Sequence, residues 1–357
     1  MRLIFILSCV LAFLSCTAYF SVYLPPDQYF WAGFWAMTVP LFLIANFLVA
    51  STLLLFKQYK TALPTAFALV AGSRFIVSTF VWHPVENKTP TDFTVLSYNS
   101  HFLGSFDKLS KKEIKELRKD FGQTLIKENT DIMCFQEYLE GYKQIDITKS
   151  FRKAGFKYEF FSPALSGWTK ERGGMIIFSR YPILKTKAIR RKKLDINQII
   201  YADIKTPQGI VRVFNVHLQS NRISSVYFKK GQAKAQAKRS VRLVTKKLGD
   251  GFVLRAEQMR IIEAELAASP YPTIVCGDFN DLPYSYTYMR MQRQHQNAFE
   301  RAGNGFGFTF NGFLPFLRID HQFASRDFEI TKFNTCSYIK FSDHYPVKAS
   351  YALKAKE

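Results

Sequence analysis

The segment 273–286, TIVCGDFNDLPYSY, places two polar side chains directly after a short apolar run. Asp278 and Asn280 are one residue apart, so on an extended backbone they would point the same way. A carboxylate and an amide that project together from the end of a strand can hold a phosphate and position a water molecule beside it. This segment alone indicates a phosphate site, and other parts of the chain supply groups that would complete it.

Other apolar runs also end in one or two polar residues, which is the pattern of buried strands that meet a loop. These residues are Asn99 in VLSYNS, Glu137 in IMCFQEY, His217 in VRVFNVHLQS, Asp320 in RIDHQF, and Asp343 and His344 in FSDHYPV. Together with the GDFND residues they form the inventory of a hydrolytic metal site. Hard oxygen ligands suit magnesium or manganese, and an Asp–His pair suits general base catalysis.

The ordered motifs SYN, QE, SRYPI, VHL, GDFND, RIDH and SDHYPV resemble those of the endonuclease/exonuclease/phosphatase superfamily. That group includes deoxyribonuclease I, exonuclease III, sphingomyelinases and inositol-polyphosphate 5-phosphatases. The resemblance covers residues 93–353. It implies an α/β (α+β) fold like that of deoxyribonuclease I, a four-layer αββα sandwich of two packed mixed sheets, with the site at one edge of the sheets.

The resemblance also implies a metal centre and a set of ligands. Glu137 would be the main ligand of Mg²⁺, with Asn99 and Asp343 close by. Mn²⁺ is the alternative ion.

The same resemblance implies roles for the remaining motif residues. Asp278 and Asn280 would orient the attacking water and the phosphate. His344 would contact or activate the phosphate while Asp320 holds its imidazole, and His217 would donate to a phosphate oxygen. Whether Asp278 or His344 is the general base stays open.

Two further residues are candidates for substrate binding. Arg172 precedes Gly173 and Gly174 and would reach a phosphate as a bidentate donor, unless it is an ordinary loop arginine. His101 follows Asn99 by two residues and would line the cleft, unless it is an ordinary loop histidine. The VHL segment departs from exonuclease III-like repair enzymes, which usually have a tyrosine-containing strand there, and this argues against an abasic-site repair enzyme.

Helices and strands must position these residues. A helix over 108–128 is predicted, with Ser110 as its N-cap and Glu113 completing a capping box. The turn at 207–209 predicts a hairpin of strands 201–204 and 210–217. Residues 224–268 are expected to be largely helical, and 306–310 are expected to form a strand.

The N-terminal part, residues 1–83, is predicted to be a membrane anchor. Residues 3–23, 31–56 and 61–82 are apolar stretches long enough to cross a bilayer. Arg74 interrupts the third stretch, so two to three transmembrane helices are expected, and a cleaved signal peptide is the alternative for the first. Residues 84–92 would be a linker and 93–354 the catalytic domain.

The positive charges of the anchor predict its orientation. Arg2, Lys57 and Lys60 flank the apolar stretches, whereas the loop 25–29 has Asp27 and neither lysine nor arginine. The positive-inside rule places the basic ends in the cytoplasm. We therefore expect a multi-pass protein of the cell inner membrane whose catalytic domain lies on the extracytoplasmic, periplasmic side.

The chain carries a net charge of +21, and its charge favours anionic partners. Two segments concentrate the basic residues, namely 185–193 and 221–260. Each is either a solvated helical face or an electrostatic contact surface for a membrane or a nucleic acid. No protein partner is evident, and oligomeric state stays open.

These observations predict a membrane-anchored, metal-dependent hydrolase of phosphodiester or phosphomonoester bonds. A nuclease is slightly preferred because the domain is basic, and a phospholipid or sphingomyelin-type phosphodiesterase is the alternative because of the anchor. A third interpretation is an inactive fold used as a membrane-tethered binding module. The intact set of polar residues argues against it.

Overall fold

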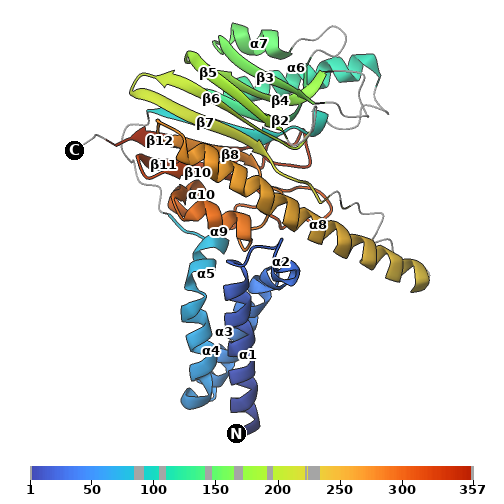
Figure 1. The fold of residues 1–357 in the computed structure, drawn as a ribbon, viewed down its shortest axis with the longest axis vertical. Coiled ribbons are helices and arrows are strands. Elements are labelled where there is room, and N and C mark those ends of the chain that lie inside the picture. Colours follow the sequence, from blue (N-terminus) through green and yellow to red (C-terminus); the bar gives the residue numbers. More distant parts are fainter. Residues whose placement is uncertain are drawn as a thin grey trace. The chain divides into compact units, whose positions relative to one another are not determined.

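The computed structural model describes residues 2–83, 92–103, 110–140, 147–164, 172–190, 196–221, 223 and 234–354 (Figure 1). The chain divides into two compact units. The first contains Met1–Val81, Asn221–Arg260 and Leu282–Arg293, and the second contains Trp82–Ser220, Ile261–Asp281 and Gln294–Glu357. Two segments from the C-terminal half thus group with the N-terminal helices, which the sequence did not indicate.

The N-terminal helices of the first unit are α1 (Arg2–Ser21), α2 (Phe30–Ala36), α3 (Val39–Leu55), α4 (Tyr59–Ala71) and α5 (Ser73–Thr79). By length and composition, α1 is long and apolar enough to cross a membrane. The pairs α2–α3 and α4–α5 reach the same criterion only when each pair counts as one span, and they bend by 43° and 57°.

The bends occur where the sequence weakens helical continuity. Pro40 lies in the first turn of α3, a position where its missing N–H costs nothing but where the preceding helix cannot run through. Gly72 separates α4 from α5. Arg74, which interrupted the third predicted stretch, lies after that break, and its guanidinium donates to the Gln292 side chain within the same unit.

Polar contacts join the apolar helices to one another. The Asn46 amide of α3 donates to Ser15 Oγ of α1 at 2.6 Å, and Trp35 Nε1 of α2 donates to Thr17 Oγ1 at 3.1 Å. Such bonds between apolar helices specify which faces meet. The unit also contains α9 (Tyr286–Gln292) and the part of α8 (Lys234–Ala267) that ends at Arg260.

The second unit contains two six-stranded sheets. One has the order β11-β12-β1-β2-β4-β3 and the other β5-β6-β7-β8-β10-β9. The pairs β1–β2 and β7–β8 are parallel and the other pairs antiparallel, so both sheets are mixed as predicted. The strands are β1 (Phe93–Asn99), β2 (Ile132–Glu140), β3 (Tyr158–Ala164), β4 (Arg172–Ser179), β5 (Ile183–Arg190), β6 (Gln198–Thr206), β7 (Gly209–His217), β8 (Thr273–Asp278), β9 (His295–Asn297), β10 (Asp320–Ser325), β11 (Phe328–Thr335) and β12 (Val347–Leu353).

Helices cover the outer faces of the sheets. A buried cluster joins α6 (Lys111–Lys127) and α7 (Ile147–Lys153) to the first sheet through Phe121, Phe135 and Phe151. The last turns of α8 run along the second sheet, and α10 (Ala298–Ala302) lies near β11 (Figure 1). The predicted sandwich of two packed mixed sheets with helices is confirmed.

Buried amides fasten the two sheets together. Gln136 Nε2 of β2 donates to Asn215 Oδ1 of β7 at 2.6 Å, and Asn215 Nδ2 donates in turn to the carbonyls of Phe135 and Ile176. Gln322 of β10 donates to two carbonyls of the first sheet. Gln136 precedes Glu137, Asn215 lies two residues before His217, and Gln322 lies two residues after Asp320, so these bonds fix the strands close to the polar residues at their ends.

The structure tests three local predictions, namely a capping box, a hairpin and a strand. Ser110 and Glu113 form the predicted capping box of α6, and the hairpin of β6 and β7 is present. The predicted strand at 306–310 is wrong, since it contributes only a single bridge between Phe310 and His344. Gly305 and Gly307 adopt positive φ angles of 73° and 61°, which interrupts an extended backbone.

Candidate active site

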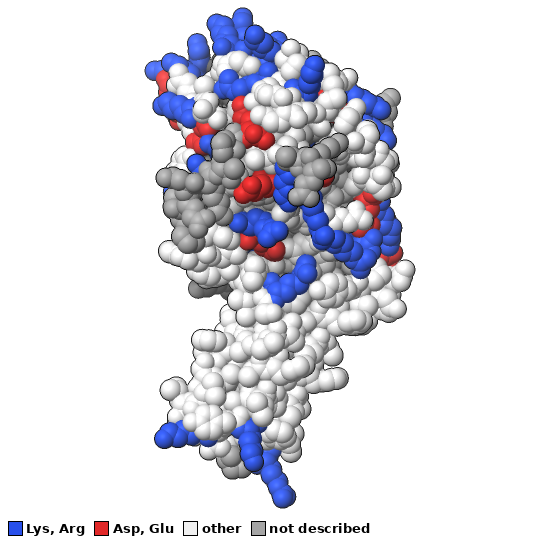
Figure 2. Space-filling model, turned by 90° about the vertical axis from the view of Figure 1, so that its left-hand side faces the viewer, with Lys and Arg blue, Asp and Glu red and all other residues white. Residues whose placement is uncertain are grey.

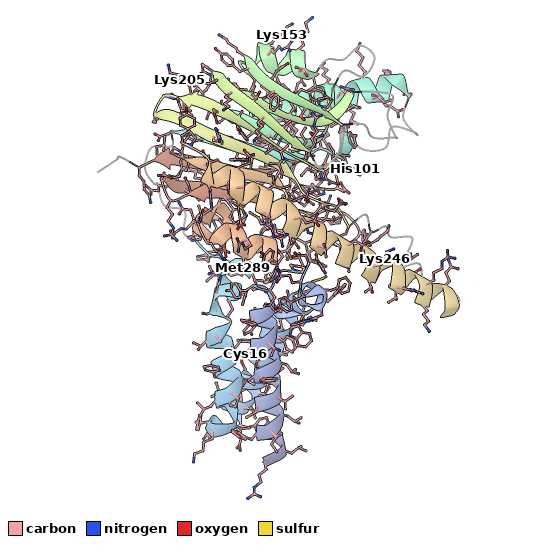
Figure 3. The ribbon with its side chains drawn as sticks, viewed as in Figure 1. Cys16, His101, Lys153, Lys205, Lys246 and Met289 are labelled. Carbon is pink, nitrogen blue, oxygen red and sulfur yellow. The ribbon has the colours of Figure 1, made fainter. Side chains whose placement is uncertain are left out.

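Strand ends bring the predicted residues to one edge of the second unit. Asn99 ends β1, His217 ends β7 and Asp278 ends β8. Because β7 and β8 are parallel, His217 lies beside Asp278, and because β10 is antiparallel to β8, its first residue Asp320 is the register partner of Asp278. Figure 3 labels His101, which follows β1, at the same end of the strands.

The backbone at this edge adopts an uncommon conformation at three polar residues. Glu137 lies at an irregularity between β2 and β4 with a φ of 48°, and His101 and Asn280 have φ angles of 43° and 51°. Left-handed backbone at residues other than glycine costs about 1–3 kcal/mol each and collects at functional sites. Each of these side chains therefore takes a direction that regular strand geometry would not give it.

Gly277 makes the approach of β8 to β7 possible. Its φ is 146°, and an added Cβ would lie 1.9 Å from the Val216 carbonyl oxygen. Only glycine fits this position. The close approach fixes where Asp278 lies relative to His217, since these two residues are the next register pair along the two strands.

The predicted metal ligands lie around His101. Glu137 Oε2 lies 3.4 Å and Asp343 Oδ1 lies 3.6 Å from His101 Nδ1. Asn99 Oδ1 accepts a hydrogen bond from the His101 backbone N–H at 3.0 Å. Two carboxylates and an amide oxygen are hard donors of the kind that Mg²⁺ and Mn²⁺ prefer, so the donor set fits such an ion.

The charges in this cluster reinforce one another. The hydrogen bond that the His101 imidazole donates to the Glu137 carboxylate is the main cause that raises the pKa of His101 above its usual value, and Asp343 adds to it. Burial alone would raise the pKa of Glu137, but His101 and His217 outweigh it and hold the pKa below its usual range. The carboxylate of Glu137 is therefore stabilised in its ionised form.

Asp278 is the centre of a second group of contacts. Its Oδ2 accepts hydrogen bonds from Asn99 Nδ2 at 2.9 Å and from Asn280 Nδ2 at 3.0 Å. His217 Nε2 and His344 Nε2 lie 3.7 Å and 3.9 Å from the same oxygen. Asn280 reaches Asp278 by folding back in a left-handed turn, so the expectation that both residues project from one extended strand is wrong although their proximity is right.

Asp320 and His344 form the predicted pair. His344 Nδ1 lies 2.8 Å from Asp320 Oδ2, and both side chains are buried. Burial alone would lower the pKa of His344, but the carboxylates of Asp320 and Asp278 outweigh it and raise the pKa to about 10. Burial, together with the negative charge of Asp320, raises the pKa of Asp278. Asp278, Asp320 and His344 thus form a buried acidic and histidine cluster that could itself hold a metal ion.

The remaining candidates separate into two groups. His101 lies at the site, as predicted. Arg172 begins β4, but its side chain lies outside the described residues. His321 points away from the site, since its Nε2 lies 3.0 Å from the Asp281 carbonyl oxygen and its ring packs against Phe279.

Two supporting residues were not predicted. Thr309 Oγ1 accepts hydrogen bonds from the backbone N–H groups of Ile319 and Asp320, both at 3.1 Å. The Phe310 ring packs edge-on against the His344 imidazole with their centroids 5.2 Å apart. The sequence carries no signal for either contact, because both depend on how the loop after α10 folds back over the strand ends.

Comparison with known proteins gives two family matches. Residues 96–344 match the model of the endonuclease/exonuclease/phosphatase family, and residues 1–79 match a domain of unknown function. No curated protein matches the chain.

Solved structures of similar fold cover 74–75% of this chain. An endonuclease/exonuclease/phosphatase from Beutenbergia cavernae DSM 12333 is 16% identical with a TM-score of 0.54, over 74% of this chain and 72% of that one. A Bacteroides thetaiotaomicron protein of that family is 17% identical with a TM-score of 0.50, over 75% and 100%. The human Nocturnin catalytic domain with bound sulfate anion is 13% identical with a TM-score of 0.50, over 74% and 94%. At these identities the likeness shows the fold.

Proposed function

Because the chain belongs to the endonuclease/exonuclease/phosphatase family, we propose that it hydrolyses a phosphate ester by in-line attack of water and depends on a divalent metal ion, Mg²⁺ or alternatively Mn²⁺. The observation that carries the proposal is the meeting of two groups at one edge of the sheets. One group is the carboxylate pair of Glu137 and Asp343, and the other is Asp278 with the Asp320–His344 pair.

Glu137, Asp343 and Asn99 would hold the metal ion. When bound there, the ion would polarise the phosphoryl oxygens and neutralise the charge that develops on them. The His101 imidazole now lies between the two carboxylates. More than half of the His101 side chain is exposed, so it can turn outward when a cation arrives.

The proton of the attacking water would pass to Asp278. This residue is buried, and the Asn280 amide and backbone N–H fix its two oxygens. The raised pKa of His344 keeps its imidazole protonated near neutral pH, which suits a donor to a phosphate oxygen better than a base. His217 would donate to another phosphate oxygen, and Asp320 would hold the His344 ring in place.

Two substrate classes are proposed within this chemistry. A nuclease is supported by the net positive charge of the chain. A phospholipid or sphingomyelin-type phosphodiesterase is supported by the loop 304–317, which contains no charged residue and exposes Phe306, Phe313, Leu314 and Phe316. Asn311 N donates to the Asp343 carbonyl and Tyr345 N to the Thr309 carbonyl, so this apolar loop is fastened beside His344.

A metal-ligand variant tests the proposed activity. The full chain in nanodiscs, supplied with Mg²⁺, is assayed on plasmid DNA, RNA, sphingomyelin and inositol phosphates. Glu137→Gln should abolish activity because it removes one ligand charge at nearly constant volume, while Glu116→Gln on the exposed face of α6 should leave activity unchanged. Full activity of the wild type in excess EDTA, or of the Glu137 variant, would contradict the proposed site. A wild type without activity on any phosphoester would favour the binding module.

A further inference from the structure

A basic stretch of helix α8 has no role in the site just described. Residues 236–247 contain no acidic side chain, and Val241 is 65% exposed. The basic residues of the stretch are Lys238, Arg239, Arg242, Lys246 and Lys247, the first four of which are exposed. Figure 3 labels Lys246 on this part of α8. The stretch belongs to the same unit as the apolar helices.

The following turn of α8 packs tightly against α2. A Cβ added to Gly249 would lie 2.2 Å from the Phe30 ring, and one added to Gly33 would lie 2.4 Å from the Phe252 ring. The rings of Phe34 and Phe252 meet edge-on with centroids 5.2 Å apart. Two glycines are thus required where the helices meet, and this contact fixes which face of α8 is turned toward the apolar helices.

Three of these basic side chains, those of Lys238, Arg242 and Lys246, lie near that same face. Lys238, Gly249 and Arg260 follow one another at intervals of eleven residues, which is about three helical turns. Gly249 contacts Phe30, and the Arg260 guanidinium forms an ion pair with Asp27 in the loop before α2. Arg242 and Lys246 follow Lys238 at four-residue spacing and stay close to the same line. These side chains therefore lie on the face of α8 that, further along the helix, packs against the apolar helices.

We infer that residues 236–247 of α8 lie along the bilayer surface and bind anionic lipid headgroups. Figure 1 shows α8 running across the direction of α1, as a surface helix beside a spanning helix would. The helix that it packs against, α2, carries Trp31 and Trp35, a residue type that favours the membrane interface. Each basic residue held near an anionic surface strengthens attachment roughly fivefold.

A nucleic acid fits this surface less well. The stretch contains no aromatic side chain on which a base could stack. Its basic face is also turned toward the side on which the apolar helices lie, where a bilayer leaves little room for a polyanion in solution. The inference rests on the membrane placement of α1–α5 and does not depend on phosphoesterase activity.

Hydrogen exchange of the full chain in nanodiscs tests the inference. Backbone amides of 236–247 should exchange roughly tenfold or more slowly in phosphatidylglycerol than in phosphatidylcholine, because three or more basic residues would hold the helix on the anionic surface. High salt should remove the difference. Equal exchange in both lipids would overturn the inference. Slow exchange of the α1 amides in both kinds of nanodisc would show separately that the anchor lies in the membrane.

Variants on two helices show whether the effect is specific. The triple variant Lys238→Gln, Arg242→Gln and Lys246→Gln should lose the lipid dependence. The matched variant Lys112→Gln, Lys115→Gln and Lys119→Gln removes the same charge from exposed positions of α6 and should keep it. Lipid dependence that survives in the first variant, or that disappears in both, would overturn the inference. The inference would also be overturned if duplex DNA, added to phosphatidylcholine nanodiscs, slowed the exchange of 236–247 more than phosphatidylglycerol nanodiscs do.

Discussion

Asp278 is the residue on which the polar contacts of the site converge. Two amides donate to its Oδ2, and two imidazole nitrogens lie within 4 Å of that oxygen. The four side chains around it come from four separate strands or loops. Its proposed function as the proton acceptor thus depends on parts of the chain that are distant in sequence.

The Asp320–His344 pair should act as a single unit. Asp320→Asn would leave the imidazole in reach but remove the carboxylate that orients it and stabilises its protonated form. We expect kcat to fall by roughly 10²–10⁴, the range for losing one acid–base group. Because such pairs are non-additive, the double variant with His344→Ala should be little worse than His344→Ala alone.

The measurement is kcat of the two single variants and the double variant on the substrate that the activity screen identifies. Substrate binding should change less than turnover. Losses that multiply in the double variant would show that the residues act independently, and their assigned roles would be withdrawn.

At the scale of elements, the polar residues at the strand ends were easier to predict from the sequence than the exposed strands and the irregularities of the backbone around them. Apolar runs followed by polar residues located β1, β2, β7 and β8, because strands buried on both faces read as continuous apolar stretches. The exposed strand β5 was missed because its basic side chains, such as Lys185 and Lys187, hide any apolar pattern. The bulge that turns Glu137 toward the site leaves no trace in the residue types.

The bends of the apolar helices were also missed. Hydropathy measures apolar length and does not register where a helix changes direction. Pro40 and Gly72 were visible in the sequence as the residues at which helices can break. Pairing between distant segments, such as α8 with α2, had no signal because it depends on glycines whose importance appears only when the helices meet.

A buried histidine in strand β9 should make stability depend on pH. His295 Nε2 lies 2.7 Å from Thr273 Oγ1, and burial lowers the pKa of His295 from 6.5 to about 4. Between these values the unfolded chain binds a proton that the folded chain does not bind. The free energy of unfolding of the second unit should therefore fall as the pH is lowered from 6.5 toward 4.

Urea unfolding of the detergent-solubilised chain at several pH values in this window measures the effect. His295→Asn should give a shallower dependence of the unfolding midpoint on pH, because it removes the group that titrates. An unchanged slope in that variant would assign the pH dependence to other groups.

At the scale of the whole molecule, the charges of the apolar unit bear on its proposed orientation. Arg2 begins α1, and Lys57 and Lys60 lie at the turn from α3 to α4, so all three are at one end of these helices. Figure 2 shows blue side chains at that end and almost none along the flank of the helices. By the positive-inside rule this end would face the cytoplasm, and the periplasmic location of the catalytic domain stays a prediction.

A reporter fusion tests that orientation. An enzyme that is active only in the periplasm, fused after Glu357, should be active, because the predicted three spans would carry residue 357 across the membrane. The same fusion with a reporter that works only in the cytoplasm serves as the control. A signal from the cytoplasmic reporter alone would show that the orientation is reversed or that the number of spans is even.

The interleaving of the two units along the chain has a consequence for biosynthesis. Residues 1–81 leave the ribosome first, yet their unit also needs Asn221–Arg260 and Leu282–Arg293. Until those segments are synthesised, Phe30 and Gly33 of α2 lack the α8 residues that cover them. The unit that contains residues 1–81 is thus completed only after residue 293 is made, and a ribosome that stalls before residue 282 leaves it open to the quality-control proteases of the membrane.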